Sequence, residues 1–126
     1  MSMKKFRFRQ FQAYKDALKF QKDVKDLTRK KFPKDEQFYL TSQIWRALDS
    51  IILNIAEGAD RGTDKDFAHF LNNSHTSLNE VVACLDLAVN NNYIFESEEI
   101  AYLKNAENLA NQITAFRVKL LKEPTK

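Results

Sequence analysis

The sequence has little of the material that tight turns and covalent cross-links require. Its 126 residues include only two glycines, two prolines and one cysteine. So few turn residues disfavour a sheet built from many tight hairpins and favour a few long helices joined by short loops. The lone Cys84 cannot form an internal disulfide, and nothing indicates an oxidising compartment. The chain is therefore predicted to be mainly helical.

Long apolar runs are also missing. No stretch approaches the roughly 18 apolar residues of a membrane-spanning helix, and the N-terminal lysines are not followed by the apolar core of a signal peptide. We therefore expect a soluble, cytoplasmic protein with no membrane partner. With 44% hydrophobic residues, the chain is long enough for one compact core and too short for two. A single domain over residues 1–126 is predicted.

Residues typical of reaction centres are scarce. The only obvious nucleophile and bases are Cys84, His69 and His75. On one helix, His75 and Cys84 fall on opposite sides, and His69 lies about 22 Å from Cys84 along the axis. No metal-binding His spacing and no Gly-rich phosphate loop occurs. We therefore expect no enzyme, metal or cofactor, and we place Cys84 at a polar edge where Cys84→Ser leaves the fold nearly intact.

Two amphipathic helices are predicted in the first half of the chain. Apolar residues of the segment 11–31 fall on one side of a helix, which Pro33 ends because the residue before a proline avoids the α region. The segment 41–61 is apolar around about half its circumference, so it is expected to be central. The threonine at its start is the predicted N-cap, with Leu40 and Trp45 as a hydrophobic staple.

The second half predicts two further helices. A capping box at Thr63–Asp66 begins a helix that the three asparagines at 90–92 end. Its core-facing residues recur at alternating spacings of four and three: Phe67, Leu71, Ser74, Leu78, Val81, Leu85 and Ala88. Ser97 is the predicted cap of the last helix, which reaches the C-terminus. Short loops make consecutive helices antiparallel, so the predicted fold is an all-α, antiparallel up-down four-helix bundle.

Charge is distributed unevenly along the chain. Residues 1–34 hold twelve Lys or Arg and three acidic residues, a formal charge of +9, whereas residues 35–126 hold eight and fourteen, a charge of −6. Six basic residues of the first helix share one side: Lys15, Lys19, Lys22, Lys25, Arg29 and Lys30. This side predicts either contact with a polyanion or contact between basic and acidic surfaces of two subunits.

The N-terminus alternates basic and aromatic residues. Residues 1–7 could form a flexible basic arm, and Arg7 and Arg9 between phenylalanines are typical of segments that stack bases and neutralise phosphates of single strands. The alternative is that Phe8 and Phe11 pack against the bundle while the arginines are solvated. The sequence leaves both interpretations open.

Some apolar and polar residues fall on unexpected sides of the helices. Phe11, Leu18 and Leu53 lie among polar residues, which predicts contact with another chain in a homo-oligomer. The second helix also carries a polar row: Arg46, Ser50, Asn54, Glu57 and Arg61. This row could be a catalytic cluster, but a structural role is favoured, with an ion pair between Glu57 and Arg61.

Much of the chain resembles a known family. The motifs are Phe32 to Ile44, Arg46-Ala47, Ser50-Ile51, Asn54 to Gly58, Arg61-Gly62, Phe67 to Leu71, Ser77 to Glu80 and, more weakly, Phe8, Phe11, Tyr14 and Ala17. They resemble the four-helix-bundle proteins encoded in 23S ribosomal RNA intervening sequences. The chain departs from the family pattern at Trp45, Tyr39 and Leu53, where Arg, Gly and Pro are common.

The resemblance implies an up-down bundle that assembles as a ring-shaped homopentamer and has no known enzymatic activity. A related branch, the accessory proteins of diversity-generating retroelements, forms basic pentamers that bind nucleic acid and a reverse transcriptase. Two hypotheses follow. The protein is a non-enzymatic nucleic-acid-binding accessory factor, with RNA, single-stranded DNA or a reverse transcriptase as partner, or it is a homo-oligomeric interaction or scaffold module without a nucleic-acid partner.

Overall fold

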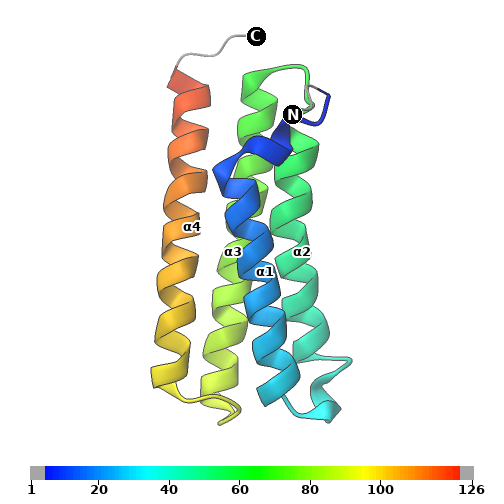
Figure 1. Ribbon diagram of the computed structural model, residues 1–126, viewed down its shortest axis with the longest axis vertical. Helices are drawn as coiled ribbons and strands as arrows, with labels where there is room; N and C mark the ends of the chain where they lie inside the picture. Colours follow the sequence, from blue (N-terminus) through cyan, green and yellow to red (C-terminus); the bar gives the residue numbers. More distant parts are fainter. Residues whose placement is uncertain (1–4, 123–126) are drawn as a thin grey trace.

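A computed structural model describes residues 5–122, and within them the chain folds into four long helices and two short 3-10 turns, with no strand. The elements in chain order are η1 (Arg7–Gln10), α1 (Gln12–Lys31), η2 (Lys34–Glu36), α2 (Leu40–Gly58), α3 (Asp64–Asn90) and α4 (Glu96–Lys122). Successive helices run in opposite directions (Figure 1). The predicted all-α, antiparallel up-down bundle is confirmed.

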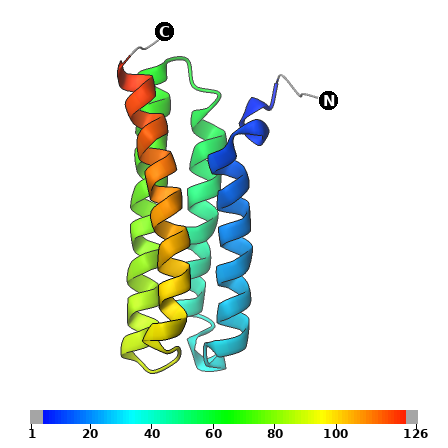
Figure 2. The ribbon, with the colours of Figure 1, turned by 60° about the vertical axis from the view of Figure 1, so that its left-hand side comes forward.

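The helices are arranged as a closed square. Each helix packs against the next one in the chain, and α4 closes the square by packing against α1. Figure 2 shows α3 and α4 together on one side, with α1 at the opposite edge beside α2. One long side of α1 is therefore left facing outward. None of the four described helices combines the length and the apolar composition that a membrane span needs.

The third helix follows the sequence prediction closely. Thr63 Oγ1 accepts a hydrogen bond from the Asp66 backbone N–H at 3.1 Å, which caps the first turn. Every residue of the predicted core-facing series is buried. After Asn90 the chain leaves the helix, and Asn92 adopts a positive φ of 64°, a conformation that asparagine tolerates better than most residues.

Both other predicted caps are displaced. Helix α2 begins at Leu40, not after Thr41, and the Leu40 side chain is buried in the core. The predicted hydrophobic staple is therefore wrong, because Leu40 is the first residue of the helix and does not precede its cap. Helix α4 begins at Glu96, so Ser97 lies inside its first turn, and the backbone N–H of Phe95 donates instead to Glu98 Oε1 at 2.9 Å.

The contact between α2 and α3 is close and its buried polar groups are paired. Ser74, fully buried on α3, donates to the Ile51 carbonyl of α2 at 2.8 Å. Gly58 ends α2 earlier than the predicted Arg61, at a point where a Cβ atom would lie 2.6 Å from Phe70 Cβ. Only glycine fits against α3 at this point without a shift of its neighbours.

Candidate nucleic-acid interface

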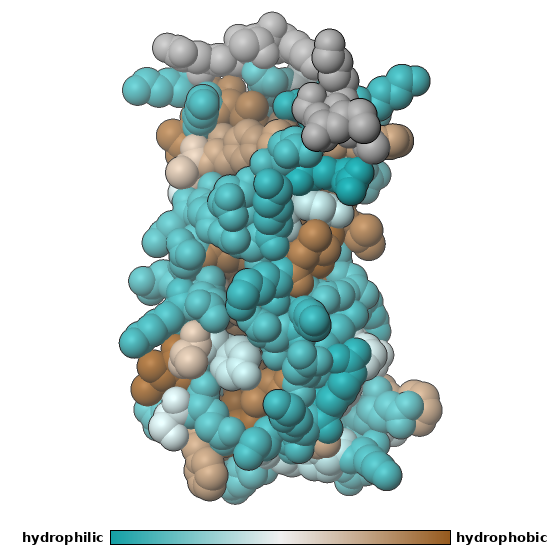
Figure 3. Space-filling model, in the orientation of Figure 1, coloured by the Kyte–Doolittle hydropathy of each residue, from teal (hydrophilic) through white to brown (hydrophobic). Residues whose placement is uncertain are grey.

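Most of the basic residues predicted on α1 do lie on its outward side. The helix turns Ala17, Phe20 and Val24 into the core, and the opposite side presents exposed basic residues: Lys15, Lys19, Lys22, Arg29 and Lys30. Figure 3 shows hydrophilic residues over most of the face on which α1 lies in Figure 1, with apolar groups visible only in separate places. We call these five residues the basic face.

The basic face has few internal charge partners. Lys19 pairs with Asp23 and Arg29 pairs with Asp26, each at 2.8 Å and at the protein surface. The hydrogen bond that Lys19 donates to Asp23 raises the pKa of Lys19. Exposed pairs of this kind contribute little to stability, because water and salt screen them. Lys15, Lys22 and Lys30 make no ion pair within residues 5–122, so their charge is available to an outside anion.

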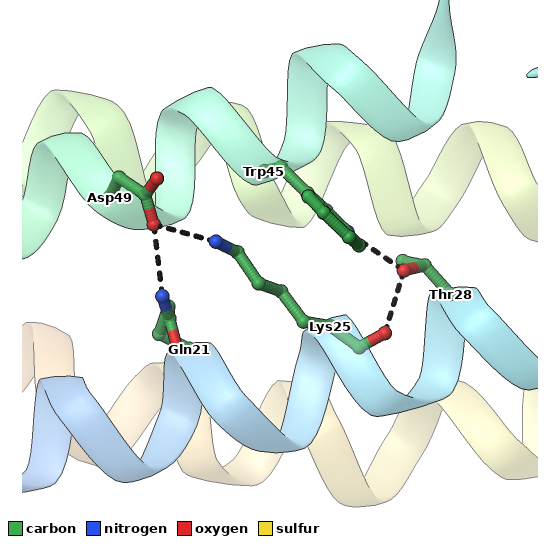
Figure 4. A network of polar contacts seen from close by, with 5 residues as sticks. All are labelled: Gln21, Lys25, Thr28, Trp45 and Asp49. Carbon is green, nitrogen blue, oxygen red and sulfur yellow. Dashed lines mark hydrogen bonds and ion pairs between the residues drawn. The ribbon is translucent and has the colours of Figure 1, made fainter. Parts of the chain in front are cut away.

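Lys25 does not belong to the basic face, contrary to the sequence prediction. Its Nζ is 2.9 Å from Asp49 Oδ1 on α2, its side chain is only 14% exposed, and it lies 4.8 Å from the centre of the Trp45 ring. Gln21 donates to the same Asp49 oxygen at 3.0 Å (Figure 4). Lys25 therefore joins α1 to α2.

The rest of this network places Trp45. Its Nε1–H donates to Thr28 Oγ1 at 2.8 Å, and the Thr28 hydroxyl donates to the Lys25 carbonyl at 2.7 Å (Figure 4). Burial acts to raise the pKa of Asp49, but the hydrogen bonds from Gln21 and Lys25 outweigh it and lower that pKa. The carboxylate is therefore charged at neutral pH and holds Lys25 in place.

The N-terminal aromatic residues pack against the bundle. Arg7 donates to the Ala59 carbonyl at 2.8 Å, and its guanidinium lies 5.4 Å from the centre of the Phe11 ring. The ring of Phe8 meets Tyr14 edge-on at 5.0 Å. Arg7 and Arg9 are both exposed, and the contacts with Ala59 and Phe11 hold Arg7 against the bundle. The first four residues of the expected flexible arm lie outside the described residues.

Of the three predicted interface residues, Phe11 is accounted for within the chain. It is half-buried, stacked on Phe67 at 6.1 Å and edge-on to Phe116 at 5.1 Å. The reason for assigning it to an interface was wrong, because the start of α1 is covered by α3 and α4. Leu18 and Leu53 are 44% and 63% exposed, and their predicted role in an interface stays a prediction.

The polar row of α2 is brought together only in part. Ser50 shares a hydrogen bond of 2.8 Å with Ser77 of α3, and Asn54 Nδ2 donates to the Ser50 carbonyl at 2.8 Å. The predicted pair of Arg61 with Glu57 is wrong: Arg61 lies beyond the end of the helix and pairs with Asp66 at 2.8 Å. Arg46 and Glu57 are exposed. Ser50 and Asn54 therefore help to fix how α2 packs against α3, and Arg61 contacts the first turn of α3.

Cys84 is a core residue and not an edge residue. It is 1% exposed, and burial raises the pKa of its thiol to about 11. The thiol is therefore protonated at neutral pH and is a poor nucleophile. Because a hydroxyl buried here needs a partner, Cys84→Ser is expected to destabilise the fold by about 1–3 kcal/mol, not to leave it nearly intact.

Two features near the helix ends were not predicted from the sequence: an exposed pair of aromatic residues and a buried glutamate. Phe38 and Tyr39, between η2 and α2, are 82% and 72% exposed. Two consecutive aromatic residues in a short connection, outside any helical periodicity, were the available signal. Glu99 is 5% exposed on α4, and burial followed by a hydrogen bond with Asp86 raises its pKa to about 7. The first turn of α4 has three acidic residues, Glu96, Glu98 and Glu99, and nothing in the sequence shows which of them is buried.

These observations define the class: a four-helix-bundle protein whose first helix carries an outward basic face. The family model for 23S rRNA-intervening sequence proteins matches residues 9–115, and the chain belongs to that family. A solved structure of a protein of unknown function from the S23 ribosomal protein family of Bacteroides thetaiotaomicron is similar, with 21% identity and a TM-score of 0.59 over 88% of this chain and 99% of that one. This likeness shows the same fold. No curated protein matches the chain.

Proposed function

We propose that the protein is a non-enzymatic, homo-oligomeric accessory factor that binds single-stranded nucleic acid, RNA or DNA, through the basic face of α1. The observation that carries the proposal is that Lys15, Lys22 and Lys30 are exposed on one outward side of α1 and make no ion pair within residues 5–122. Lysines held in this way gain by meeting phosphates, since binding releases the condensed counterions of the nucleic acid.

Assembly would strengthen this binding. In the ring-shaped homopentamer that the family resemblance implies, the same face is repeated around the ring. A few contacts from each subunit then add up to strong binding, because once one subunit is bound the others meet the strand at a high effective concentration. Lys19 and Arg29 can add to the contact, since their surface pairs with Asp23 and Asp26 are weak enough to exchange for phosphate. A reverse transcriptase is a candidate protein partner for such an assembly.

A second candidate function, an interaction module without nucleic acid, is supported by Leu18 and Leu53. Both are exposed leucines. Leu18 precedes Gln21 by one turn of α1 and Leu53 follows Asp49 by one turn of α2, so the bond between Gln21 and Asp49 places the two leucines near each other on antiparallel helices. In this function the apolar pair and the adjoining lysines meet an acidic surface of a second copy.

The test uses charge reversal of the lysines that have no ion pair. Lys15→Glu, Lys22→Glu and Lys30→Glu are combined in one variant, and a matched control combines Lys65→Glu, Lys104→Glu and Lys119→Glu, which changes the net charge equally on exposed positions of α3 and α4. Binding to single-stranded RNA at low salt is measured by fluorescence anisotropy, and the oligomeric state by light scattering. We expect the α1 variant to lose at least tenfold in affinity, the control to lose much less, and both to keep the oligomer.

The two candidate functions give opposite results in this experiment. If the α1 variant dissociates the oligomer, the basic face serves subunit contact and the second function is correct. In that case Leu18→Glu should dissociate the oligomer as well, because it places a charge in an apolar contact. If both triple variants lose affinity equally, binding follows net charge alone and the basic face has no special part in it.

A further inference from the structure

A pocket lies where the end of α1, the η2 connection and the start of α2 meet. It is an open hollow of about 500 Å³, a volume in the range of small-ligand sites. Phe32 and Trp45 contribute to its lining from α1 and α2, and Phe38 from the connection between them. Phe32 is buried and Trp45 half-buried, whereas the Phe38 ring is 82% exposed. The pocket therefore combines a fixed aromatic lining with one aromatic ring that is open to a ligand.

Polar side chains in the pocket have unused hydrogen-bonding capacity. Gln37, Thr41 and Ser42 also line it, and in the described part of the chain no hydrogen bond is formed by any of these three side chains. Between them they offer an amide, which both donates and accepts, and two hydroxyls. Groups of this kind at the edge of an aromatic site suit a planar heterocycle with donors and acceptors on its rim.

The pocket is also continuous with the basic face. Arg29 lines it, and its guanidinium lies 5.0 Å from the centre of the Trp45 ring. Lys34 lines it from η2, and Lys30 is exposed next to Arg29 at the end of α1. Arg29 pairs with Asp26 at the protein surface, and within residues 5–122 Lys34 makes no ion pair. A strand whose phosphates follow the basic face of α1 is thus led to the mouth of the pocket.

We propose that this pocket receives one unstacked base of the single strand, which stacks on Phe38 while Arg29 and Lys34 contact the flanking phosphates. The proposal rests on the nucleic-acid-binding function proposed above and adds a base-binding subsite to it. Aromatic rings stack on any base, so little sequence preference follows. Such stacking also covers apolar surface of the Phe38 ring, which is 82% exposed.

The test separates base binding from phosphate binding. Two single strands of about ten nucleotides are compared, an oligodeoxyadenylate and a strand of abasic residues with the same number of phosphates. Trp45 is the only tryptophan of the chain, so its fluorescence reports directly on the pocket. We expect the oligodeoxyadenylate to bind more tightly than the abasic strand and to change Trp45 fluorescence more, because the phosphates of either strand reach Arg29 beside Trp45 but only the first strand places a base in the pocket.

Substitution of the stacking ring sharpens the test. Phe38→Ala should weaken binding of oligodeoxyadenylate by about 5- to 150-fold, the equivalent of about 1–3 kcal/mol for one stacked base, with no effect on the abasic strand. Phe95→Ala is the matched control, since Phe95 is another phenylalanine of a connection, 72% exposed, and does not line the pocket. It should leave the binding of both strands unchanged.

Each other outcome overturns the subsite. If both strands bind equally, with the same fluorescence and no effect of Phe38→Ala, phosphate binding stands and the base subsite does not exist. If neither strand binds at low salt, the proposed function fails, and the subsite with it. If Phe38→Ala instead dissociates the oligomer, the pocket holds a side chain of a second copy and not a base.

Discussion

Helix α1 and the other three helices are held in the bundle by different means. Between α2 and α3 the contact is buried, with Ser74 and Gly58 allowing close approach. The edges of α1 are instead joined by side-chain hydrogen bonds that are partly exposed, from Gln21 and Lys25 to Asp49 on one side and from Gln112 of α4 to Asp16 on the other. Helix α1 also buries Ala17, Phe20 and Val24 in the core, but it packs less extensively on α2 and α4 than α3 does, so more of the packing lies among α2, α3 and α4.

This difference bears on function. The outward side of α1 carries charges that the fold does not use, so it can change with little effect on stability, which is what a binding surface needs. The buried side of α2 and α3 has no such freedom, because each of its polar groups has an assigned partner. Substitutions in the two regions should therefore separate stability from binding.

Among substitutions in α2, α3 and α4, the largest effect on stability is expected at Glu99. Its pKa of about 7, against an ordinary value of 4.5, means that the folded protein keeps a proton that the unfolded chain releases. The free energy of unfolding should therefore fall as pH rises from about 4.5 to 7 and stay low above it. Glu99→Gln keeps the side chain neutral and should stabilise the protein by about 1–3 kcal/mol at pH 8.

Urea unfolding at pH 5 and pH 8 measures this effect. Glu107→Gln, an exposed substitution on the same helix, is the control and should follow the wild type. A wild-type protein as stable at pH 8 as at pH 5 would show that the Glu99 carboxyl is not held in its protonated form by burial.

A smaller effect is expected at Gly58, which tests the close approach of α2 and α3. In Gly58→Ala the new methyl group would lie 2.6 Å from Phe70 Cβ and 3.0 Å from Phe67 Cδ1, so the helices must move apart, at a net cost of about 1–2 kcal/mol. Gly62→Ala is the matched control, since nothing lies within 4 Å of its added methyl and its φ is not positive. It should be neutral or slightly stabilising in thermal unfolding. Equal effects of the two substitutions would refute the close contact.

The smallest effect is expected at Asp49, which tests the polar attachment of α1. Asp49→Asn removes the charge that holds Lys25 but keeps an acceptor for Gln21, and the pair is partly exposed. The loss of stability should be below about 1 kcal/mol and should shrink further at high salt. A loss as large as that of Gly58→Ala would mean that α1 is attached as firmly as the other helices.

The sequence predicted the bundle well because periodicity reports burial. The series from Phe67 to Ala88 named the buried side of α3 correctly, and Asn92 marked its end. Caps were less predictable. Thr41 and Ser97 have the right chemistry for an N-cap, but α2 begins at Leu40 and α4 at Glu96. A residue suited to a cap can also lie inside the first turn, so residue type alone does not fix where a helix begins.

The candidate site was predictable only in outline. The basic face could be predicted from the angular positions of residues around a helix, which follow from the sequence alone. The contacts that take Lys25 out of this face could not be predicted, because they depend on Asp49 and Trp45 of α2 lying next to α1. The packing of Phe11 and the pocket beside Phe38 likewise require contacts between elements far apart in the chain. Glu99 is buried by its position against α3, which no local pattern reveals.

The salt dependence of nucleic-acid binding tests the central claim most directly. The association constant for single-stranded RNA is measured over a range of salt concentrations for the wild type and for the variant with Lys15, Lys22 and Lys30 changed to Glu. The logarithm of the constant should fall linearly with the logarithm of salt concentration, with a slope of roughly −0.7 per phosphate contact. The variant's slope should be shallower by about 2 for each subunit that contacts the strand, because each subunit loses three contacts. Absence of binding at low salt, or an unchanged slope in the variant, would contradict the account.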